Sequence, residues 1–171
     1  DYTDRLPRAP SKKNGKRVAL VGAGPASLTV ANDLLPLGYD VVIFEGLPVP
    51  GGLMRSNIPS FRLPAEVLDR ELNDIIGMGA QLKLGHRIES MKKLLTDGFD
   101  AIFVGTGAPK GKELKLPGRY DDAARVHIGI DWLESVAFEH IKSIGEKVLI
   151  IGVGNTAMDC CRTSLRLGAK S

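Results

Sequence analysis

One six-residue motif, GAGPAS at residues 22–27, constrains the fold of this chain more than any other feature. A short apolar run at residues 17–21 precedes it, and residues 25–37 follow it with the apolar spacing of a helix. A second apolar run at residues 40–45 then completes a strand, glycine turn, helix, strand unit. This order predicts an α/β, Rossmann-like fold with parallel strands.

The glycine spacing of this motif is typical of a turn that approaches a pyrophosphate. The first glycine permits a tight turn, the second lets phosphate reach the backbone, and the third position must be small, which Ser27 satisfies. Glu45 ends the next strand, where a carboxylate accepts hydrogen bonds from adenosine ribose hydroxyls and repels a 2′-phosphate. This pattern predicts FAD or NAD at the first site; a glycine turn needed only for packing is the alternative.

The same pattern returns near the end of the sequence. The apolar run at residues 147–151 leads into GVGNTA at residues 152–157, and a helix is predicted over residues 155–167. The strand that would read the second ribose is not in this sequence, so the choice between NAD and NADP stays open. We expect a linker at 1–16, a nearly complete FAD-binding domain at 17–110, a crossover at 111–146 and a truncated NAD(P)-binding domain at 147–171.

Further elements and loops fill the interval between the two motifs. Two loops carry glycines that would let backbone approach a ligand, Gly51-Gly52 within the predicted loop 46–63 and residues 105–107 at a strand end. A plain turn is the alternative for each, and Arg62 is either a phosphate or carboxylate partner or a solvated charge. The remaining predicted elements are helices at 64–78, 90–95 and 131–138 and strands at 80–84 and 100–104.

Composition narrows the classes of function. The chain is 43% hydrophobic and 25% charged, as in a soluble globular protein. A net charge of +3 and 5% aromatic residues argue against a nucleic-acid partner. We expect a cytoplasmic protein, since no apolar run approaches the roughly 20 residues of a membrane span and no signal peptide opens the sequence. Cys160 and Cys161 are adjacent, which fits a reduced compartment, and no metal-ligand spacing is present.

Four stretches of the sequence together resemble a known family. They are GAGPAS, FEGLPVPGGLMRSNIPSFRLP, FDAIFVGTGAPKGKELKLPG and IIGVGNTAMDCCRTSLRLGA. They are similar to the small (beta) subunit of glutamate synthase, to the FAD/NADPH segment of dihydropyrimidine dehydrogenase and to flavin subunits of multisubunit oxidoreductases. The resemblance covers roughly residues 16–170, and its most specific part is the PGGL to FRLP segment.

The resemblance implies an FAD-containing NAD(P)H oxidoreductase subunit that passes electrons to an iron–sulfur partner and serves a larger catalytic subunit. This sequence departs from the family in having no cysteine cluster before Gly22 and no returning Gly-Asp segment. The implied contacts to FAD are Gly22, Ala23, Gly24, Pro25, Ala26, Ser27, Glu45, Gly51, Gly52, Leu53, Arg62, Ile88, Thr106 and Gly107. The implied contacts to NAD(P)H are Gly152, Gly154, Asn155 and Thr156.

No catalytic acid, base or nucleophile is predicted, because the cofactors would supply the hydride chemistry. A pyridine-nucleotide disulfide reductase is an alternative, but the Gly51-Gly52 loop has no cysteine and Cys160-Cys161 is not a C-x-x-C pair. A flavin monooxygenase would need a substrate cavity that the sequence does not indicate. A non-catalytic dinucleotide-binding module, structural or regulatory, is the remaining alternative.

Overall fold

The computed structural model describes residues 7–115, 117–122 and 125–171. The chain forms two compact units, and each is described by itself. The first contains the residues up to Met54 together with Ala65–Gly107, and the second contains Arg55–Pro64 and Ala108–Ser171. Residues 55–64 therefore group with the second unit, whereas the sequence analysis assigns them to a single domain over residues 17–110.

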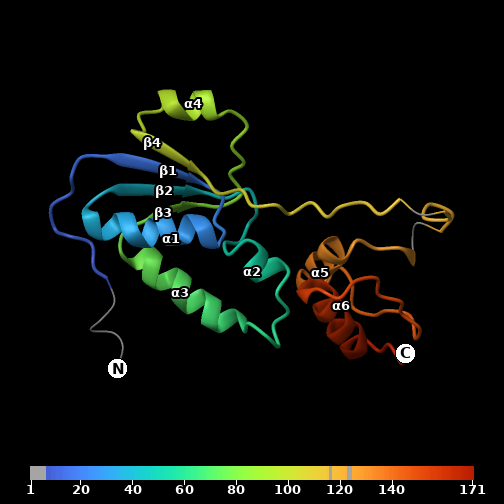
Figure 1. The fold of residues 1–171 in the computed structure, drawn as a ribbon. Coiled ribbons are helices and arrows are strands. Elements are labelled where there is room, and N and C mark those ends of the chain that lie inside the picture. The colour runs from blue at the N-terminus through green and yellow to red at the C-terminus, as the bar shows by residue number, and fades with distance from the viewer. Residues whose placement is uncertain (1–6, 116, 123–124) are drawn as a thin grey trace. The chain divides into compact units, whose positions relative to one another are not determined.

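The first unit is built on a parallel sheet of four strands (Figure 1). The strands are β1 (Arg17–Val21), β2 (Asp40–Phe44), β3 (Gln81–Lys83) and β4 (Ala101–Val104), in the order β3-β2-β1-β4. β1 pairs with β2 on one side and with β4 on the other, so the direction of winding reverses at β1. In open α/β sheets ligands bind at such a reversal, beyond the carboxyl ends of the strands.

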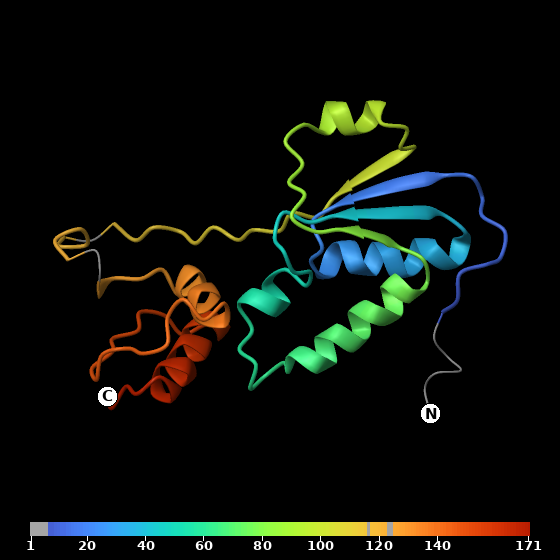
Figure 2. The ribbon, with the colours of Figure 1, turned by 180° about the vertical axis from the view of Figure 1, so that it is seen from behind.

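Helices cover both faces of this sheet, as Figure 2 shows from behind. Side chains alternate along β1 because successive residues of a strand point to opposite faces. Val18 and Leu20 belong to the core cluster that includes residues of α1 (Pro25–Leu34) and α3 (Ala65–Gly77). Ala19 and Val21 belong to the opposite cluster with Leu94 of α4 (Met91–Thr96). Leu20 and Ile43 are fully buried, and each contributes about 1.5–3 kcal/mol of hydrophobic stabilisation.

The first helix is shorter than the sequence predicts. α1 ends at Leu34 and a 3₁₀ turn, η2 (Leu35–Leu37), follows it. Pro36 lies inside the predicted helix and has no N–H for an α-helical hydrogen bond, which explains the early end. Gly38 then takes φ 85°, a left-handed conformation that directs the chain into β2.

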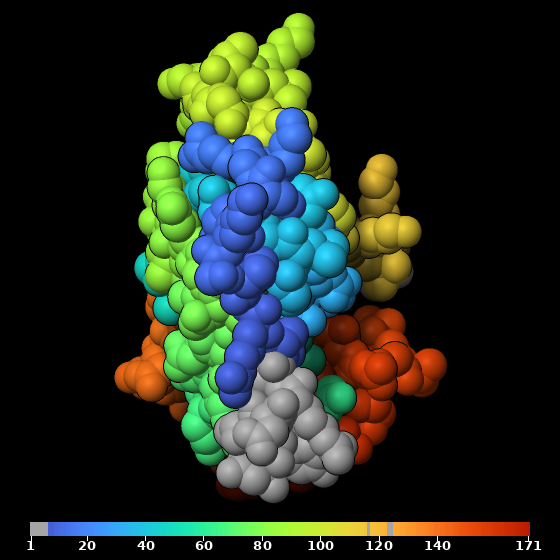
Figure 3. All heavy atoms as spheres, turned by 90° about the vertical axis from the view of Figure 1, so that its left-hand side faces the viewer, coloured from blue at the N-terminus to red at the C-terminus, as the bar shows by residue number. Residues whose placement is uncertain are grey.

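The described part of the lead-in before β1, residues 7–16, is anchored to the first unit. Asn14 donates from its backbone N–H to the Gly38 carbonyl at 2.9 Å, and from its side-chain amide to the Leu37 carbonyl at 3.1 Å. Lys13 pairs with Asp40 at 3.5 Å. In Figure 3 the lead-in is dark blue and runs over the surface of the first unit between lighter blue and green segments.

The second unit contains α5 (Gly129–Ala137) and α6 (Asn155–Arg166), which pack around Trp132, Leu133 and Cys160. The predicted apolar side of residues 131–138 is confirmed, since Trp132 and Leu133 are buried. The strand predicted at residues 147–151 is wrong: this segment has no strand structure. A strand exists only when a neighbouring strand completes its hydrogen bonds, and the described residues of this unit place no strand beside it. Its Val148 N–H donates to the Ser171 carbonyl at 2.8 Å, a contact that makes no strand ladder.

The predicted loop at residues 46–63 also needs a correction. It contains a single helical turn, α2 (Leu53–Ser56), directly after Gly51-Gly52. The turn is too short to show helical periodicity in a sequence, which is why the pattern did not reveal it. In the described part of the chain, no helix combines the length and the hydropathy that crossing a membrane requires.

Candidate functional site

The carboxyl ends of the four parallel strands lie at one edge of the sheet in the first unit. The residues that follow them are Gly22 after β1, Glu45 after β2, residues 84–88 after β3 and residues 105–107 after β4. The sequence motifs of this unit therefore gather at the edge where open α/β sheets bind ligands.

Gly22 is required by the fold itself. Its φ is 97°, and its N–H donates to the Phe44 carbonyl at 2.7 Å, which joins the turn to β2. A Cβ at this position would lie 2.5 Å from the Gly105 carbonyl oxygen. Both backbone strain and close packing therefore exclude other residues here.

Gly24 differs from Gly22 in both respects. It is the N-cap of α1 with φ −81° and ψ 178°, an extended conformation that any residue adopts. A Cβ built there would have no atom within 4 Å. Neither the backbone nor the packing of the chain requires glycine, so the open space beside the first turn of α1 fits a ligand that approaches the backbone.

Glu45 connects the glycine turn to the end of β2. Its Oε2 accepts a hydrogen bond from the Ala23 N–H at 2.7 Å, and its Oε1 accepts one from the Leu47 N–H at 2.9 Å. A carboxylate has about four acceptor sites, so each oxygen keeps capacity for a further donor such as a ribose hydroxyl. The carboxylate is half-buried and held in one orientation.

The Gly51-Gly52 loop packs directly on the glycine turn. Gly51, at φ 117°, donates its N–H to the Ala23 carbonyl at 2.9 Å. Gly52 has φ 53°, and a Cβ there would lie 2.9 Å from the Gly24 Cα. The structure thus brings together two glycine loops that the sequence separates, and Leu53 follows them as the half-exposed first residue of α2.

The remaining predicted residues of the first site have different surroundings. Ser27 is fully buried, and its hydroxyl has no hydrogen-bond partner among the described residues. Ile88 is partly buried against the core cluster of β2 and α4. Thr106 and Gly107 are exposed after β4. Sequence reasoning did not single out His86, whose backbone N–H donates to the Glu45 carbonyl at 2.7 Å and whose ring lies 5.3 Å from that of Phe44.

The glycine loop of the second unit repeats the geometry of the first. Gly152 has φ 140°, and Gly154 is the N-cap of α6 with φ −81° and ψ 177°. A Cβ on Gly154 would again have no atom within 4 Å. Asn155 and Thr156 are exposed and begin α6. The loop borders a cavity of about 1210 Å³ within this unit, which is above the usual range for small-molecule sites.

Arg62 has a partner that the sequence does not indicate. Its Nη1 donates to Oδ2 of Asp159 on α6 at 2.6 Å, and both residues belong to the second unit. The Asp159 side chain is only 6% exposed, whereas that of Arg62 is 40% exposed. A buried aspartate on a helix face is detectable in a sequence only as a charged residue among apolar neighbours, which does not identify its partner.

The two cysteines are free thiols. Burial, and then the nearby Asp159 carboxylate, raise the pKa of Cys160 to about 11. A thiol with this pKa is protonated at neutral pH, whereas disulfide exchange needs the thiolate. Cys160 is a buried residue of the core around Trp132 and Leu133, and its thiol is not poised for disulfide exchange.

A parallel α/β sheet with one dinucleotide-type glycine loop, and a second unit with another, define a class of dinucleotide-binding proteins. Comparison with known families agrees with this class. The chain belongs to the pyridine nucleotide-disulphide oxidoreductase family, which matches residues 16–171. This membership agrees with the predicted class of pyridine-nucleotide-dependent oxidoreductase.

Curated relatives confirm the resemblance stated from the sequence. The chain is 38% identical over 161 residues to the beta subunit of NADP(+)-dependent formate dehydrogenase from Moorella thermoacetica, covering 92% of this chain and 23% of the relative. It is 38% identical over 177 residues to the small chain of NADPH glutamate synthase from Mycobacterium tuberculosis, covering 95% and 36%. The chain thus spans less than two fifths of the length of either relative.

A solved structure shows the same fold. FprA of Mycobacterium tuberculosis in complex with NADPH matches with a TM-score of 0.74 over 86% of this chain and 36% of that chain, at 22% sequence identity. This likeness confirms the Rossmann-like α/β fold.

Proposed function

We propose that this chain is the electron-input part of a multisubunit oxidoreductase, in which FAD accepts a hydride from NAD(P)H and passes electrons to an iron–sulfur partner. The observation that carries the proposal is the repeated geometry at Gly24 and Gly154. Each is an N-cap glycine with unstrained backbone and open space where a Cβ would be. Two such positions are what two dinucleotides would need.

The residues of the first unit fit FAD. The open space beside Gly24 lies at the N-terminus of α1, where free backbone N–H groups and the helix dipole favour a pyrophosphate. The Glu45 carboxylate, oriented by Ala23 and Leu47, would accept hydrogen bonds from ribose hydroxyls. We propose these FAD contacts: Gly22, Ala23, Gly24, Pro25, Ala26, Ser27, Glu45, Gly51, Gly52, Leu53, Ile88, Thr106 and Gly107. Arg62 is left out because its guanidinium pairs with Asp159.

The second glycine loop fits the pyrophosphate of NAD(P)H, with Gly152, Gly154, Asn155 and Thr156 as its contacts. Gly152 makes the turn at φ 140°, and Gly154 leaves the backbone accessible at the start of α6. When bound, the nicotinamide and the flavin supply the hydride chemistry. The side chains and backbone of this protein bind and orient both cofactors, and no acid, base or nucleophile of the chain is needed.

The names of the relatives support the partner in this proposal. One is a formate dehydrogenase beta subunit, another a glutamate synthase small chain, and a third an NADPH-Fe(3+) oxidoreductase subunit beta. Each name describes one component of a larger assembly. An iron–sulfur acceptor and a cytoplasmic location are part of our proposal for this chain.

A visible absorption spectrum of the purified holo-protein tests the function. We expect a flavin spectrum that is bleached anaerobically by NADH or NADPH and restored by a one-electron acceptor. A protein that stays colourless after incubation with FAD would support the alternative of a non-catalytic module. A flavin that NAD(P)H reduces but that delivers electrons only to a disulfide substrate would support the disulfide reductase.

A further inference from the structure

The Arg62–Asp159 ion pair joins an exposed guanidinium to a buried carboxylate, and the proposed cofactor sites do not use it. The Asp159 carboxylate is 6% exposed, and its second oxygen, Oδ1, has no hydrogen-bond partner among the described residues. Arg62 therefore supplies the charge compensation that the described structure gives this carboxylate. A buried charge without its partner is strongly destabilising, so the pair fixes Arg62 and α6 together.

Two neighbouring contacts hold the same segment. The Asn57 side-chain amide donates to the Ile130 carbonyl of α5 at 2.6 Å, and the Arg166 guanidinium of α6 lies 3.8 Å from the centre of the Phe61 ring. Residues 55–64 are thus attached to both helices of the second unit by a hydrogen bond to a backbone carbonyl, a cation–π contact and an ion pair. The ion pair and the cation–π contact are to α6, and the hydrogen bond is to α5.

Residues 55–64 lie in the sequence between two segments of the first unit. Residues 55–64 follow Gly51-Gly52 and the start of α2 and precede α3, and those neighbouring segments belong to the first unit. Asp159 lies on α6 only one helical turn beyond the Gly152–Thr156 loop. The ion pair therefore links residues 55–64, which follow the Gly51-Gly52 loop in the chain, to α6, which begins at the second glycine loop.

We propose that Arg62 and Asp159 are positioning residues for hydride transfer: their ion pair restrains α6, and with it the Gly154 loop, against residues 55–64. This inference rests on the proposed function. Hydride transfer requires the nicotinamide and flavin rings to lie within a narrow range of distances and orientations. A misplacement of about 1 Å costs on the order of a hundredfold in rate. Arg62 acts in this proposal through α6 and does not contact the flavin.

The test uses the holo-protein with the variants Arg62→Met, Asp159→Asn and both together, and with Arg62→Lys as the conservative variant. Arg162→Met is the matched control, because Arg162 is an exposed arginine on the same helix. Three quantities are measured: flavin content, the rate of flavin reduction by NAD(P)H in stopped flow, and amide hydrogen exchange of residues 55–64 and 155–166 without nucleotide.

We expect Arg62→Met and Asp159→Asn to keep their flavin, to exchange faster in both segments, and to be reduced about ten to a hundred times more slowly. The double variant should be no worse than either single one, because the two residues act as a unit. Arg62→Lys should recover part of the rate, and Arg162→Met should match the wild type.

Two results would overturn the inference. Loss of flavin in Arg62→Met with unchanged hydrogen exchange in α6 would show that Arg62 is a flavin ligand. Unchanged exchange and unchanged reduction rate would show that the pair restrains nothing. A wild-type protein that binds no flavin would instead contradict the proposed function, and the hydrogen-exchange comparison would still test the restraint.

Discussion

The glycines of the two loops separate into those that the fold needs and those that a ligand would need. Gly22 is held at φ 97° against the Gly105 carbonyl, and Gly52 approaches the Gly24 Cα. Gly24 and Gly154 have ordinary backbone angles and free space around an added Cβ. A sequence motif cannot make this distinction, because all four positions read simply as glycine.

This difference gives a prediction for three substitutions. Serine is a favoured N-cap residue, so Gly24→Ser and Gly154→Ser should leave the thermal stability of the cofactor-free protein unchanged or slightly higher. Gly24→Ser should weaken FAD binding, and Gly154→Ser should slow reduction by NAD(P)H while FAD stays bound. Gly22→Ala should lower the unfolding free energy by roughly 1–3 kcal/mol from the positive φ alone. Calorimetry without cofactor and flavin titration measure both effects.

Two results would contradict the prediction for the glycines. If all three substitutions destabilise the cofactor-free protein equally, the space beside Gly24 and Gly154 is filled by the protein and is no ligand site. Loss of both cofactors from either serine variant would mean that the two loops are not separate sites.

Glu45 combines a structural and a proposed binding role. Glu45→Gln removes the charge and leaves one side-chain oxygen for the two N–H donors of Ala23 and Leu47. We expect FAD binding to weaken by roughly 1–3 kcal/mol, the usual scale for a charge-assisted hydrogen bond. Flavin retention during gel filtration and an FAD titration measure this loss. The control is Glu71→Gln on the exposed side of α3, and flavin content equal to wild type in both variants would remove Glu45 as the ribose ligand.

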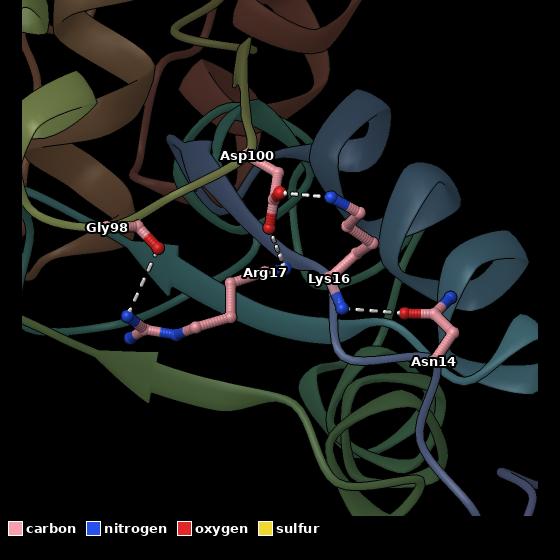
Figure 4. Close-up of polar contacts among 5 residues, drawn as sticks. All are labelled: Asn14, Lys16, Arg17, Gly98 and Asp100. Carbon is pink, nitrogen blue, oxygen red and sulfur yellow. Dashed lines mark hydrogen bonds and ion pairs between the residues drawn. The ribbon is translucent and has the colours of Figure 1, made fainter.

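Among the elements, the amino ends of β1 and β4 are joined by a charged cluster (Figure 4). Asp100 accepts hydrogen bonds from Lys16 Nζ at 2.7 Å and from the Arg17 backbone N–H at 2.9 Å. Arg17 Nη1 reaches the Gly98 carbonyl at 3.4 Å, and Asn14 Oδ1 accepts from the Lys16 N–H at 2.8 Å. The cluster ties the lead-in and two strands together at the edge opposite the glycine loops.

This cluster predicts a pH dependence of stability. The side-chain hydrogen bond from Lys16 and the backbone hydrogen bond from Arg17 hold the pKa of Asp100 below its ordinary value of 3.8. A carboxyl group with a depressed pKa in the folded state stabilises the fold above its unfolded pKa, and this contribution is lost as the pH falls through the folded pKa. We therefore expect Asp100→Asn to be less stable than wild type at neutral pH. The difference should begin to shrink as the pH falls to about 3.8 and should vanish below the lower pKa that Asp100 has in the folded state.

Urea unfolding at a series of pH values measures this effect. High salt should reduce the difference, because the pair is exposed and screened. The control Asp97→Asn changes an exposed aspartate at the end of α4 and should follow the wild-type curve. A difference between Asp100→Asn and wild type that persists unchanged into acid would show that charge is not its cause.

The elements that could be predicted from the sequence are those with a strong local signal. Buried strands such as β1 and amphipathic helices such as α3 and α6 were expected within a few residues of their observed ends. The failures have different causes. Pro36, a local signal inside the predicted helix, shortens α1, whereas the described residues place no strand beside residues 147–151. The Arg62–Asp159 pair and the contact of Gly52 with Gly24 depend on tertiary packing, so no spacing in the sequence indicates them.

At the scale of the whole molecule, the second unit exposes apolar side chains that a stable soluble domain would cover. Leu149 is 88% exposed, Ile151 is 70% exposed and Val153 is 96% exposed. Leu149 and Ile151 lie in the segment that the sequence predicts to be a buried strand, and Val153 lies in the glycine loop that follows it. Exposed apolar residues in one contiguous segment mark a surface that pairs with another segment or partner.

We therefore predict that these 171 residues, expressed alone, are poorly soluble and oxidise NAD(P)H slowly. A longer form that approaches the length of the curated relatives, together with the proposed iron–sulfur partner, should reduce a one-electron dye rapidly with NAD(P)H. The double variant Leu149→Ser with Ile151→Ser should raise the solubility of the 171-residue chain, because it removes apolar surface from water. In the longer form the same variant should lower the thermal stability, because there the two side chains would be buried. The double variant should therefore help the 171-residue chain and harm the longer form. A 171-residue chain that is soluble and turns over a small organic substrate with NAD(P)H would show that it is a complete enzyme and no electron-input module.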